Sequence, residues 1–220
     1  MKRIILLMTL IFAIPTHAYV VPTYRDLKPA SQAMLEQQRI SIPILALTNR
    51  VLTTNAGPTS AAALSLTAFT AQPDVPRNIT ITPTGTTADV ESCVVSVVGT
   101  NIFGKAISET LSFLANAATA TAGLKAFKTV SSVSFPADCE SGGFAATWII
   151  GVGDVLGLKN CMSQAGNIAW AVFDGVFEAT RATCVADADE VEKNTCDVNG
   201  TLNGAKNVDI FFVQNFACLP

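Results

Sequence analysis

The chain has 220 residues, which suits one domain or one domain with an arm. Half of its residues are hydrophobic and only 14% are charged, against about 25% in an average soluble domain. Its longest apolar run, Ile4–Ile14, falls short of the roughly 20 residues of a membrane span, which excludes a polytopic membrane protein. A net charge of −3 without a basic cluster argues against binding nucleic acid through phosphate neutralisation.

The N-terminus has the three-part pattern of a secretory signal peptide. Lys2 and Arg3 precede the apolar run, Pro15 ends it, and small residues surround a cleavage site after Ala18. We therefore predict that residues 1–18 are a signal peptide, with an uncleaved hydrophobic anchor as the less favoured alternative. Removal of this segment is predicted to leave a secreted chain that does not associate with membranes.

Residues 19–60 are predicted to form an extended N-terminal arm that leads into the main domain. Four prolines punctuate the segment, and residues 55–60 have the composition of a turn or linker. The stretch Ser31–Arg39 is compatible with one short polar helix.

Residues 61–220 are predicted to form one β-sandwich domain. Apolar and polar residues alternate with a period of two, which is typical of half-buried strands. Turns are predicted at Gly151–Gly153 and at Asp174-Gly175. Without long amphipathic helices between the strands, the pattern favours an all-β fold, an antiparallel β-sandwich or jelly-roll. The predicted strands are Leu64–Thr70, Asn78–Thr82, Cys93–Val98, Ala106–Phe113, Ala126–Phe135, Ala146–Ile150, Ile168–Phe173, Val176–Val185 and Val208–Gln214.

The six cysteines are candidates for three disulfides if the chain is exported. None lies in a C-x-x-C spacing, so zinc ribbons and thioredoxin-type redox sites are poorly supported. Buried free thiols are the alternative. Cys184 and Cys196 flank a candidate hairpin and are the most plausible local pair. The full set is Cys93, Cys139, Cys161, Cys184, Cys196 and Cys218.

Catalytic and cofactor chemistry has little support in the residues. The one histidine, His17, lies in the predicted signal peptide, so a mature chain would lack a Ser-His-Asp or Cys-His nucleophile and histidine ligands for zinc. A Gly-rich phosphate loop that follows a strand and opens a helix is also missing. We therefore expect no catalytic residues, no cofactor and no metal.

Two groups of carboxylates and two tryptophans are the candidates for a catalytic, calcium-binding or sugar-binding role. Asp174 and Glu178 are a candidate glycosidase pair, although a turn explains Asp174 equally well. The denser group Asp187, Asp189 and Glu190 offers oxygen ligands for calcium, but a solvated acidic loop is the favoured interpretation. Trp148 and Trp170 lie in apolar strands, where core packing is favoured over a sugar-binding platform.

Seven segments between roughly residues 65 and 215 carry one resemblance, in this order: Phe69–Thr80, Val97–Thr110, Lys125–Pro136, Gly151–Leu158, Glu178–Thr183, Glu192–Thr195 and Asn207–Ile210. Together they resemble a family of tailed-bacteriophage virion proteins. The resemblance implies a non-enzymatic, β-rich structural subunit of the virion, of the capsid-decoration or accessory type. Its implied partners are other copies of itself and the major capsid protein or other virion proteins.

A secretory signal and disulfides fit poorly with particles that assemble in a reducing cytoplasm. Three resolutions stay open: the cysteines oxidise after lysis, translation begins at Met34, or the fold is reused in a secreted protein. The leading hypothesis is a virion structural protein. The alternative is a secreted, disulfide-stapled surface or filament subunit or adhesin. A glycan-processing enzyme that uses Asp174 and Glu178 is the least favoured.

Overall fold

The computed structural model describes residues 34–56, 62–141, 146–162, 164–166 and 168–214. The predicted signal peptide, the predicted arm up to residue 33 and Cys218 lie outside the described residues. Within them the fold is all-β and antiparallel, as the sequence predicts. None of the helical segments found there has the length and apolar content of a membrane span. These segments are the 3-10 turns η1 (Thr87–Asp89), η2 (Ala137–Cys139) and η3 (Val191–Lys193).

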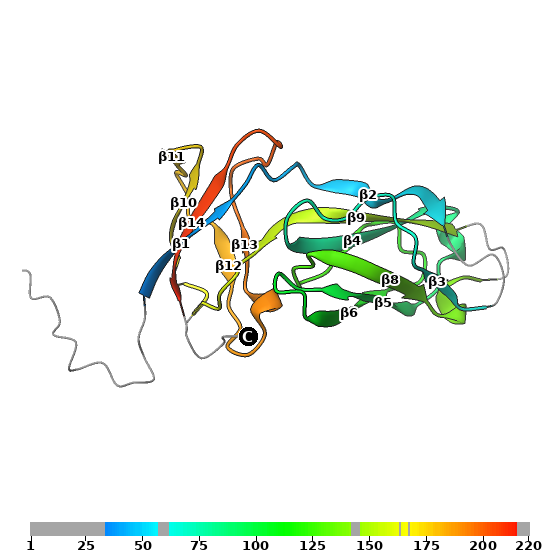
Figure 1. The fold of residues 1–220 in the computed structure, drawn as a ribbon. Helices are drawn as coiled ribbons and strands as arrows, with labels where there is room; N and C mark the ends of the chain where they lie inside the picture. The colour runs from blue at the N-terminus through cyan, green and yellow to red at the C-terminus, as the bar shows by residue number, and fades with distance from the viewer. Residues whose placement is uncertain (1–33, 57–61, 142–145, 163, 167, 215–220) are drawn as a thin grey trace, which may run out of the picture.

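The strands form three sheets (Figure 1). The first has the order β12-β13-β9-β4-β7, with β2 also paired to β9. It contains β12 (Thr183–Val185), β13 (Thr195–Asp197), β9 (Ala146–Gly157), β4 (Arg77–Gly85), β7 (Thr121–Ala122) and β2 (Leu47–Ala56). The second, in the order β3-β8-β5-β6, contains β3 (Leu64–Leu66), β8 (Thr129–Phe135), β5 (Cys93–Thr100) and β6 (Ala106–Phe113). The third, in the order β1-β14-β10-β11, contains β1 (Met34–Ile40), β14 (Val208–Gln214), β10 (Ile168–Phe173) and β11 (Val176–Phe177).

Strands β2, β4 and β9 of the first sheet pack face to face with the second sheet and form a sandwich lobe, on the right of Figure 1. Alternation in β5 sends Val95 and Val97 into its core. Trp148 of β9 is fully buried there, with its ring centroid 4.9 Å from that of Phe113 and 5.1 Å from that of Phe135. Burial of a phenylalanine side chain contributes about 2–3 kcal/mol, so this aromatic group is a main source of the lobe's stability.

The third sheet encloses a second core against the far end of the first sheet, on the left of Figure 1. Leu156 of β9 and Cys196 of β13 are fully buried in this core. Ile40 of β1 and Ile210 and Phe212 of β14 meet them from the third sheet. We call this part of the molecule the second lobe. Because β9 contributes to both cores, the two lobes share one strand.

A buried arginine holds the connection between β1 and β2 against the start of β4. The Arg77 side chain is fully buried, and its Nη1 donates to the Ile44 carbonyl oxygen at 3.0 Å and to Asp74 Oδ1 at 3.1 Å. Asp74 Oδ2 in turn accepts the Ile44 backbone N–H at 2.8 Å. Burial lowers the pKa of Arg77 against the opposing effect of Asp74. The pair therefore fixes the path by which the chain passes from one lobe to the other.

Several predicted strands are confirmed, one is longer, and the predicted strands Leu64–Thr70 and Ala126–Phe135 are shortened to β3 and β8. The structure has strands at 78–82, 93–98, 106–113, 168–173 and 208–214 as the alternation predicts. The predicted strand 146–150 continues to Gly157, so the turn predicted at Gly151–Gly153 is wrong. These two positions of β9 require glycine because neighbouring atoms come too close for a side chain. A Cβ at Gly151 would overlap the Leu47 carbonyl oxygen, and one at Gly153 would overlap the Asn78 side chain.

Two other predictions are wrong for the residues that the structure describes. The short helix considered possible over Ser31–Arg39 does not form from Met34 onward, where β1 pairs along its whole length with β14. The residues of β1 are good helix formers, so here tertiary pairing overrides local propensity. The single strand predicted at Val176–Val185 is divided into β11 and β12, which belong to different sheets. The turn at Asp174-Gly175 is confirmed, with positive φ angles at both residues.

Two disulfides join described cysteines. Cys93 at the start of β5 is bonded to Cys139 in η2, and Cys184 is bonded to Cys196. The second bond joins directly opposite positions of β12 and β13, which confirms the predicted local pair. Cys161 is disulfide-bonded as well.

Loss of each bond is expected to destabilise the fold according to the loop that it closes. The cysteines of the first bond are 46 residues apart and those of the second 12 apart. Loop-closure entropy then gives about 4 kcal/mol for the first and about 3 kcal/mol for the second. Cys93→Ala/Cys139→Ala and Cys184→Ala/Cys196→Ala should lower the free energy of unfolding in that order, measured by urea titration. Unchanged stability in both double variants would contradict the assignment.

Candidate functional site

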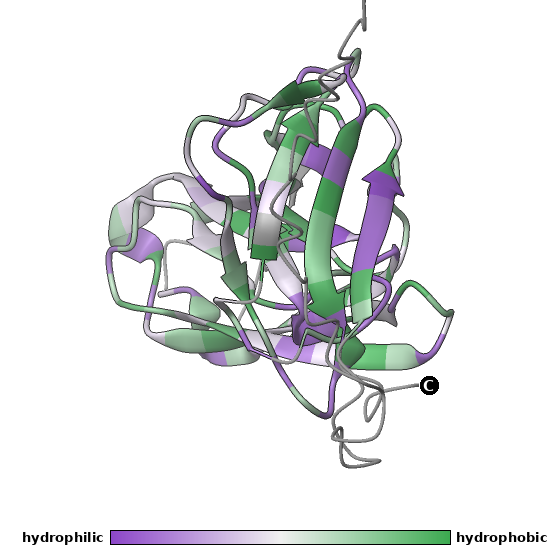
Figure 2. Ribbon diagram, turned by 90° about the vertical axis from the view of Figure 1, so that its left-hand side faces the viewer, coloured by the Kyte–Doolittle hydropathy of each residue, from purple (hydrophilic) through white to green (hydrophobic). Residues whose placement is uncertain are grey.

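The third sheet carries apolar side chains on both of its sides. Its inner side packs into the second core. On its outer side the register places Leu35 opposite Val213, Trp170 opposite Phe211, and Phe177 opposite Val172. Figure 2 views the molecule from the side of this sheet. We call the outward cluster the aromatic face and define it as Leu35, Trp170, Phe177, Phe211 and Val213.

The sequence of β14 explains why both sides are apolar. Successive side chains of a strand point to opposite sides, so Phe212 is fully buried in the core while Phe211 points outward. Strands with apolar residues on both sides are typical of sheets that are covered on both sides. The outer side of β14 therefore has the composition of a buried surface.

Three aromatic rings from three neighbouring strands form the centre of the face. The Trp170 ring centroid lies 5.3 Å from that of Phe211 and 6.0 Å from that of Phe177. Trp170 is 39% exposed and Phe177 is 66% exposed, and Leu35 at the other end of the face is 57% exposed. Neighbouring large side chains at such exposure form a contiguous apolar patch, which is the usual mark of an interaction surface.

A paired charge lies at one corner of the aromatic face. The Arg39 guanidinium donates to both carboxylate oxygens of Asp209, at 2.9 and 3.0 Å, and Gln37 Nε2 donates to Asp209 Oδ1 at 3.1 Å. The hydrogen bond from Arg39 lowers the pKa of the buried Asp209 carboxyl, and Gln37 adds to that effect. The two charges compensate each other, so this corner adds no net charge to the face.

The acidic residues considered for calcium lie between β12 and η3. Asp187 Oδ1 accepts the backbone N–H groups of Asp189 and Glu190, which lowers the pKa of Asp187. Lys193 pairs with Asp187 and Glu190. Among the residues that the structure describes, no group of three or more His, Cys, Asp or Glu side chains is arranged to hold a metal ion. The carboxylates of Asp187 and Glu190 instead pair with lysines, and that of Asp187 also accepts backbone N–H groups.

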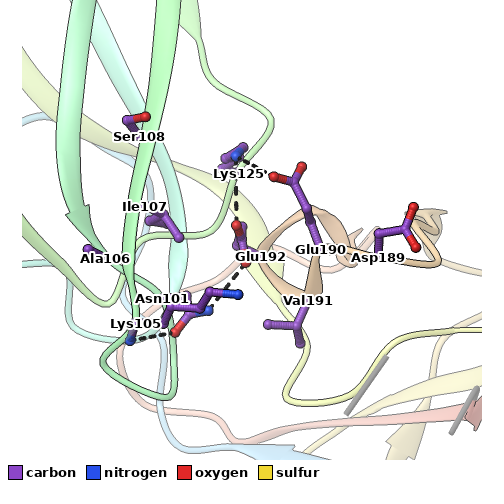
Figure 3. A pocket seen from close by; sticks show the side chains of 10 residues that line it. All are labelled: Asn101, Lys105, Ala106, Ile107, Ser108, Lys125, Asp189, Glu190, Val191 and Glu192. Atoms are coloured by element: carbon purple, nitrogen blue, oxygen red, sulfur yellow. Dashed lines mark hydrogen bonds and ion pairs between the residues drawn. The ribbon is translucent and has the colours of Figure 1, made fainter. Parts of the chain in front are cut away.

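A cavity of about 320 Å³ separates this loop from the β5–β6 hairpin (Figure 3). Lys125 Nζ lies 3.1 Å from Glu190 Oε1 and 3.7 Å from Glu192 Oε1. The buried Asn101 donates from Nδ2 to Glu192 Oε2 at 3.2 Å. Its Oδ1 accepts the Phe103 and Lys105 backbone N–H groups and so closes the hairpin. These side chains already bind one another, and they join the second lobe to the sandwich lobe.

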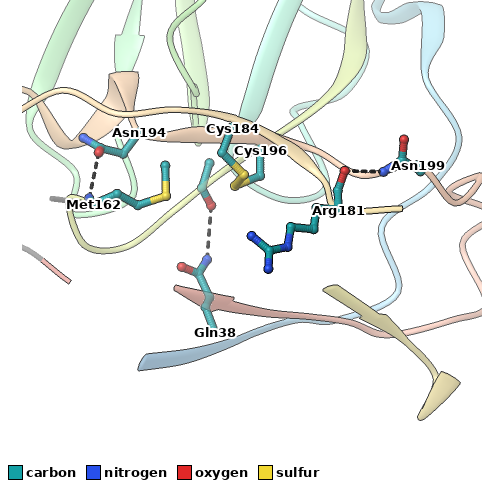
Figure 4. Close-up of a disulfide and its surroundings, with 8 residues drawn as sticks. Gln38, Met162, Arg181, Cys184, Asn194, Cys196 and Asn199 are labelled. Atoms are coloured by element: carbon teal, nitrogen blue, oxygen red, sulfur yellow. Dashed lines mark hydrogen bonds between the residues drawn. A yellow bond between two sulfur atoms is a disulfide. The ribbon is translucent and has the colours of Figure 1, made fainter. Parts of the chain in front are cut away.

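The aromatic face stands on a sheet that is fixed from beneath. Gln38 of β1 donates to the Gly157 carbonyl oxygen at 3.1 Å, and its Oε1 accepts the Lys159 backbone N–H at 2.7 Å. Glu36 forms an ion pair with Lys159 at 2.8 Å. Figure 4 shows Gln38 below the Cys184–Cys196 disulfide. The outer residues of β1 are therefore held on a rigid support.

The two carboxylates of the candidate glycosidase pair have separate surroundings. Asp174 is exposed in the turn between β10 and β11. Glu178 follows β11 and accepts the Gly200 backbone N–H, and burial raises the pKa of its carboxyl. Glu178 lines a cavity of about 430 Å³ together with Phe173, Phe177 and neighbouring residues.

The sequence predicts the burial of one tryptophan correctly and that of the other wrongly. Trp148 is in the core as predicted, whereas Trp170 is exposed on the aromatic face, so its predicted core position is wrong. The apolar run of β10 has no period-two pattern that would assign one side to water. The adjacent pair Phe211-Phe212 was the available signal, because two neighbours on a strand cannot both enter one core.

No family model, no curated protein and no solved structure matches the chain. The case for a function therefore depends on the geometry of the surfaces described above.

The Arg39–Asp209 pair predicts a pH-dependent contribution to stability. Because the pKa of Asp209 is lowered, its interactions stabilise the fold above the ordinary aspartate pKa and are lost as the pH falls through the lowered value. Arg39 is 62% exposed, so we expect Asp209→Asn to cost only about 1 kcal/mol at neutral pH. Urea unfolding at pH 7 and at about pH 2 should show the difference from the unmodified protein disappear in acid.

The exposed Asp138 of η2 provides the matched control. Asp138→Asn should leave the free energy of unfolding unchanged at both pH values. A cost of Asp209→Asn that is equal in acid and at neutral pH would contradict the proposed role of the ion pair.

Proposed function

We propose that the chain is a non-enzymatic structural subunit of a tailed-bacteriophage particle, a capsid decoration or accessory protein that assembles through its aromatic face. The observation that carries the proposal is the outward cluster of Trp170, Phe177 and Phe211 on a rigid sheet. Large contiguous apolar patches on water-soluble proteins mark interaction sites. A subunit buried in repeated contacts would cover this patch, which also suits the low overall charge.

The architecture supports a structural role in a second way. Two cores that share strand β9, the disulfides Cys93–Cys139 and Cys184–Cys196, and the Lys125–Glu192 ion pair connect the described parts of the chain to one another. Rigid subunits lose little conformational entropy when they assemble. The resemblance to virion proteins agrees with this role, with other copies and the major capsid protein as proposed partners.

The proposal predicts a fixed copy number on purified particles. Phage particles banded on a density gradient should contain the chain in constant proportion to the major capsid protein, measured by quantitative mass spectrometry. A high-salt wash provides the control, because apolar contacts survive salt that strips adventitious charged proteins. Particles that lack the chain would overturn the proposal.

A secreted, disulfide-stapled surface or filament subunit is the second candidate. The disulfides at Cys93–Cys139 and Cys184–Cys196, together with the predicted leader, favour it. N-terminal sequencing of the non-reduced native protein separates the two candidates. A start at Tyr19 in the culture medium without phage supports secretion, whereas a start at Met1 or Met34 in particles supports the virion role.

A further inference from the structure

We infer that the occupant of the aromatic face is a second copy of this chain, so that two such faces pack against each other in a symmetric pair. The inference rests on the proposed function, in which this face is the assembly surface, and it selects a second copy over the major capsid protein as the partner at this face. In a two-fold pair each copy presents the same patch, so the patch must fit itself.

Charge is the first requirement, and the face meets it. The charged side chains on its outer register positions are Arg39 and Asp209, which are paired with each other. Two copies therefore meet without an unpaired charge, whose burial would be costly. Nucleic acid or an anionic lipid surface would require uncompensated basic side chains, so the face favours a neutral, apolar partner.

Contact through the side chains is favoured over addition of a strand at the edge of the sheet. One edge strand, β11, has only two residues. The other, β1, carries Arg39 outward and Glu36 inward, and Glu36 is bound to Lys159 beneath the sheet. Charged residues and short strands are the features by which sheet edges avoid pairing. The accessible apolar surface is therefore the face itself.

The size of the face sets the strength of the pair. The four strands have seven, seven, six and two residues. At a rise of about 3.3 Å per residue and a spacing of about 4.8 Å, they present at most about 350 Å². Each partner of a standard interface buries about 800 Å², so two aromatic faces fall in the weak, transient class. The pair should then form in a concentration-dependent way and gain strength from the multiple contacts of an assembled particle.

Neighbouring residues of β11 provide a matched test. Phe177 is 66% exposed and contacts Trp170, whereas Val176 is 69% exposed and points to the opposite side of the strand. Sedimentation equilibrium of the purified, oxidised protein from about 1 to 500 µM should show a monomer–dimer equilibrium. Phe177→Asp should weaken it at least about tenfold, and Val176→Asp should leave it unchanged. Circular dichroism and melting curves verify that both variants fold.

The outcomes distinguish this inference from the proposed function. A chain that stays monomeric throughout this range, or equal weakening by both variants, overturns the inference. If that monomer still bands with particles and Phe177→Asp abolishes the banding, the shell protein occupies the face and the proposed function stands. If Phe177→Asp alone weakens the dimer but the chain is missing from particles, the inference is supported and the virion role is overturned.

Discussion

Strand β9 is the element on which both hydrophobic cores are built. Trp148, Ile150 and Val152 enter the core of the sandwich lobe, and Leu156 enters the second core near the other end of the same strand. In the middle of this twelve-residue strand, the backbone of β2 lies very close to Gly151. Glycine leaves room for that backbone because it has no side chain. Side-chain replacement there would push β2 away from β9. The two lobes therefore share one strand, and the third sheet packs over the end of β9 that enters the second core.

The position of the third sheet explains the aromatic face. Its inner side completes the second core, and its strands β10 and β14 carry apolar residues in both directions. The outer rings of Trp170, Phe177 and Phe211 expose apolar surface to water, which is unfavourable. Burial against a partner would lower the free energy by about 25 cal/mol for each Å² of apolar surface. Stability alone does not require that arrangement, because polar residues at these outward positions would leave the inner side of the sheet intact. Among the described residues, the apolar side chains thus fill two cores, and some of them gather on one outward surface.

The sequence predicts strands well where only one side is buried, because alternation then shows in the residues, as in β5 and β6. It fails at β1, whose helix-forming residues pair with a strand more than 160 positions away, a contact that local propensity does not contain. It also fails at Trp170, because a strand that is apolar on both sides does not reveal which side faces water. The side-chain contacts between the two lobes could not be predicted from the sequence either. Lys125 meets Glu190 across 65 positions, and Asn101 meets Glu192 across 91. The Cys184–Cys196 bond was predictable because its partners are close in sequence and flank one hairpin.

The central claim is that the aromatic face becomes buried on assembly, and the chain contains two tryptophans that report on it. Trp148 is fully buried within the sandwich lobe, whereas Trp170 is exposed on the face. Acrylamide quenching of tryptophan fluorescence should therefore reach one tryptophan in dilute protein and neither in the assembled form. The quenchable fraction should disappear as the protein assembles, in parallel with the sedimentation change. A quenchable fraction that stays constant between dilute and assembled protein would contradict it.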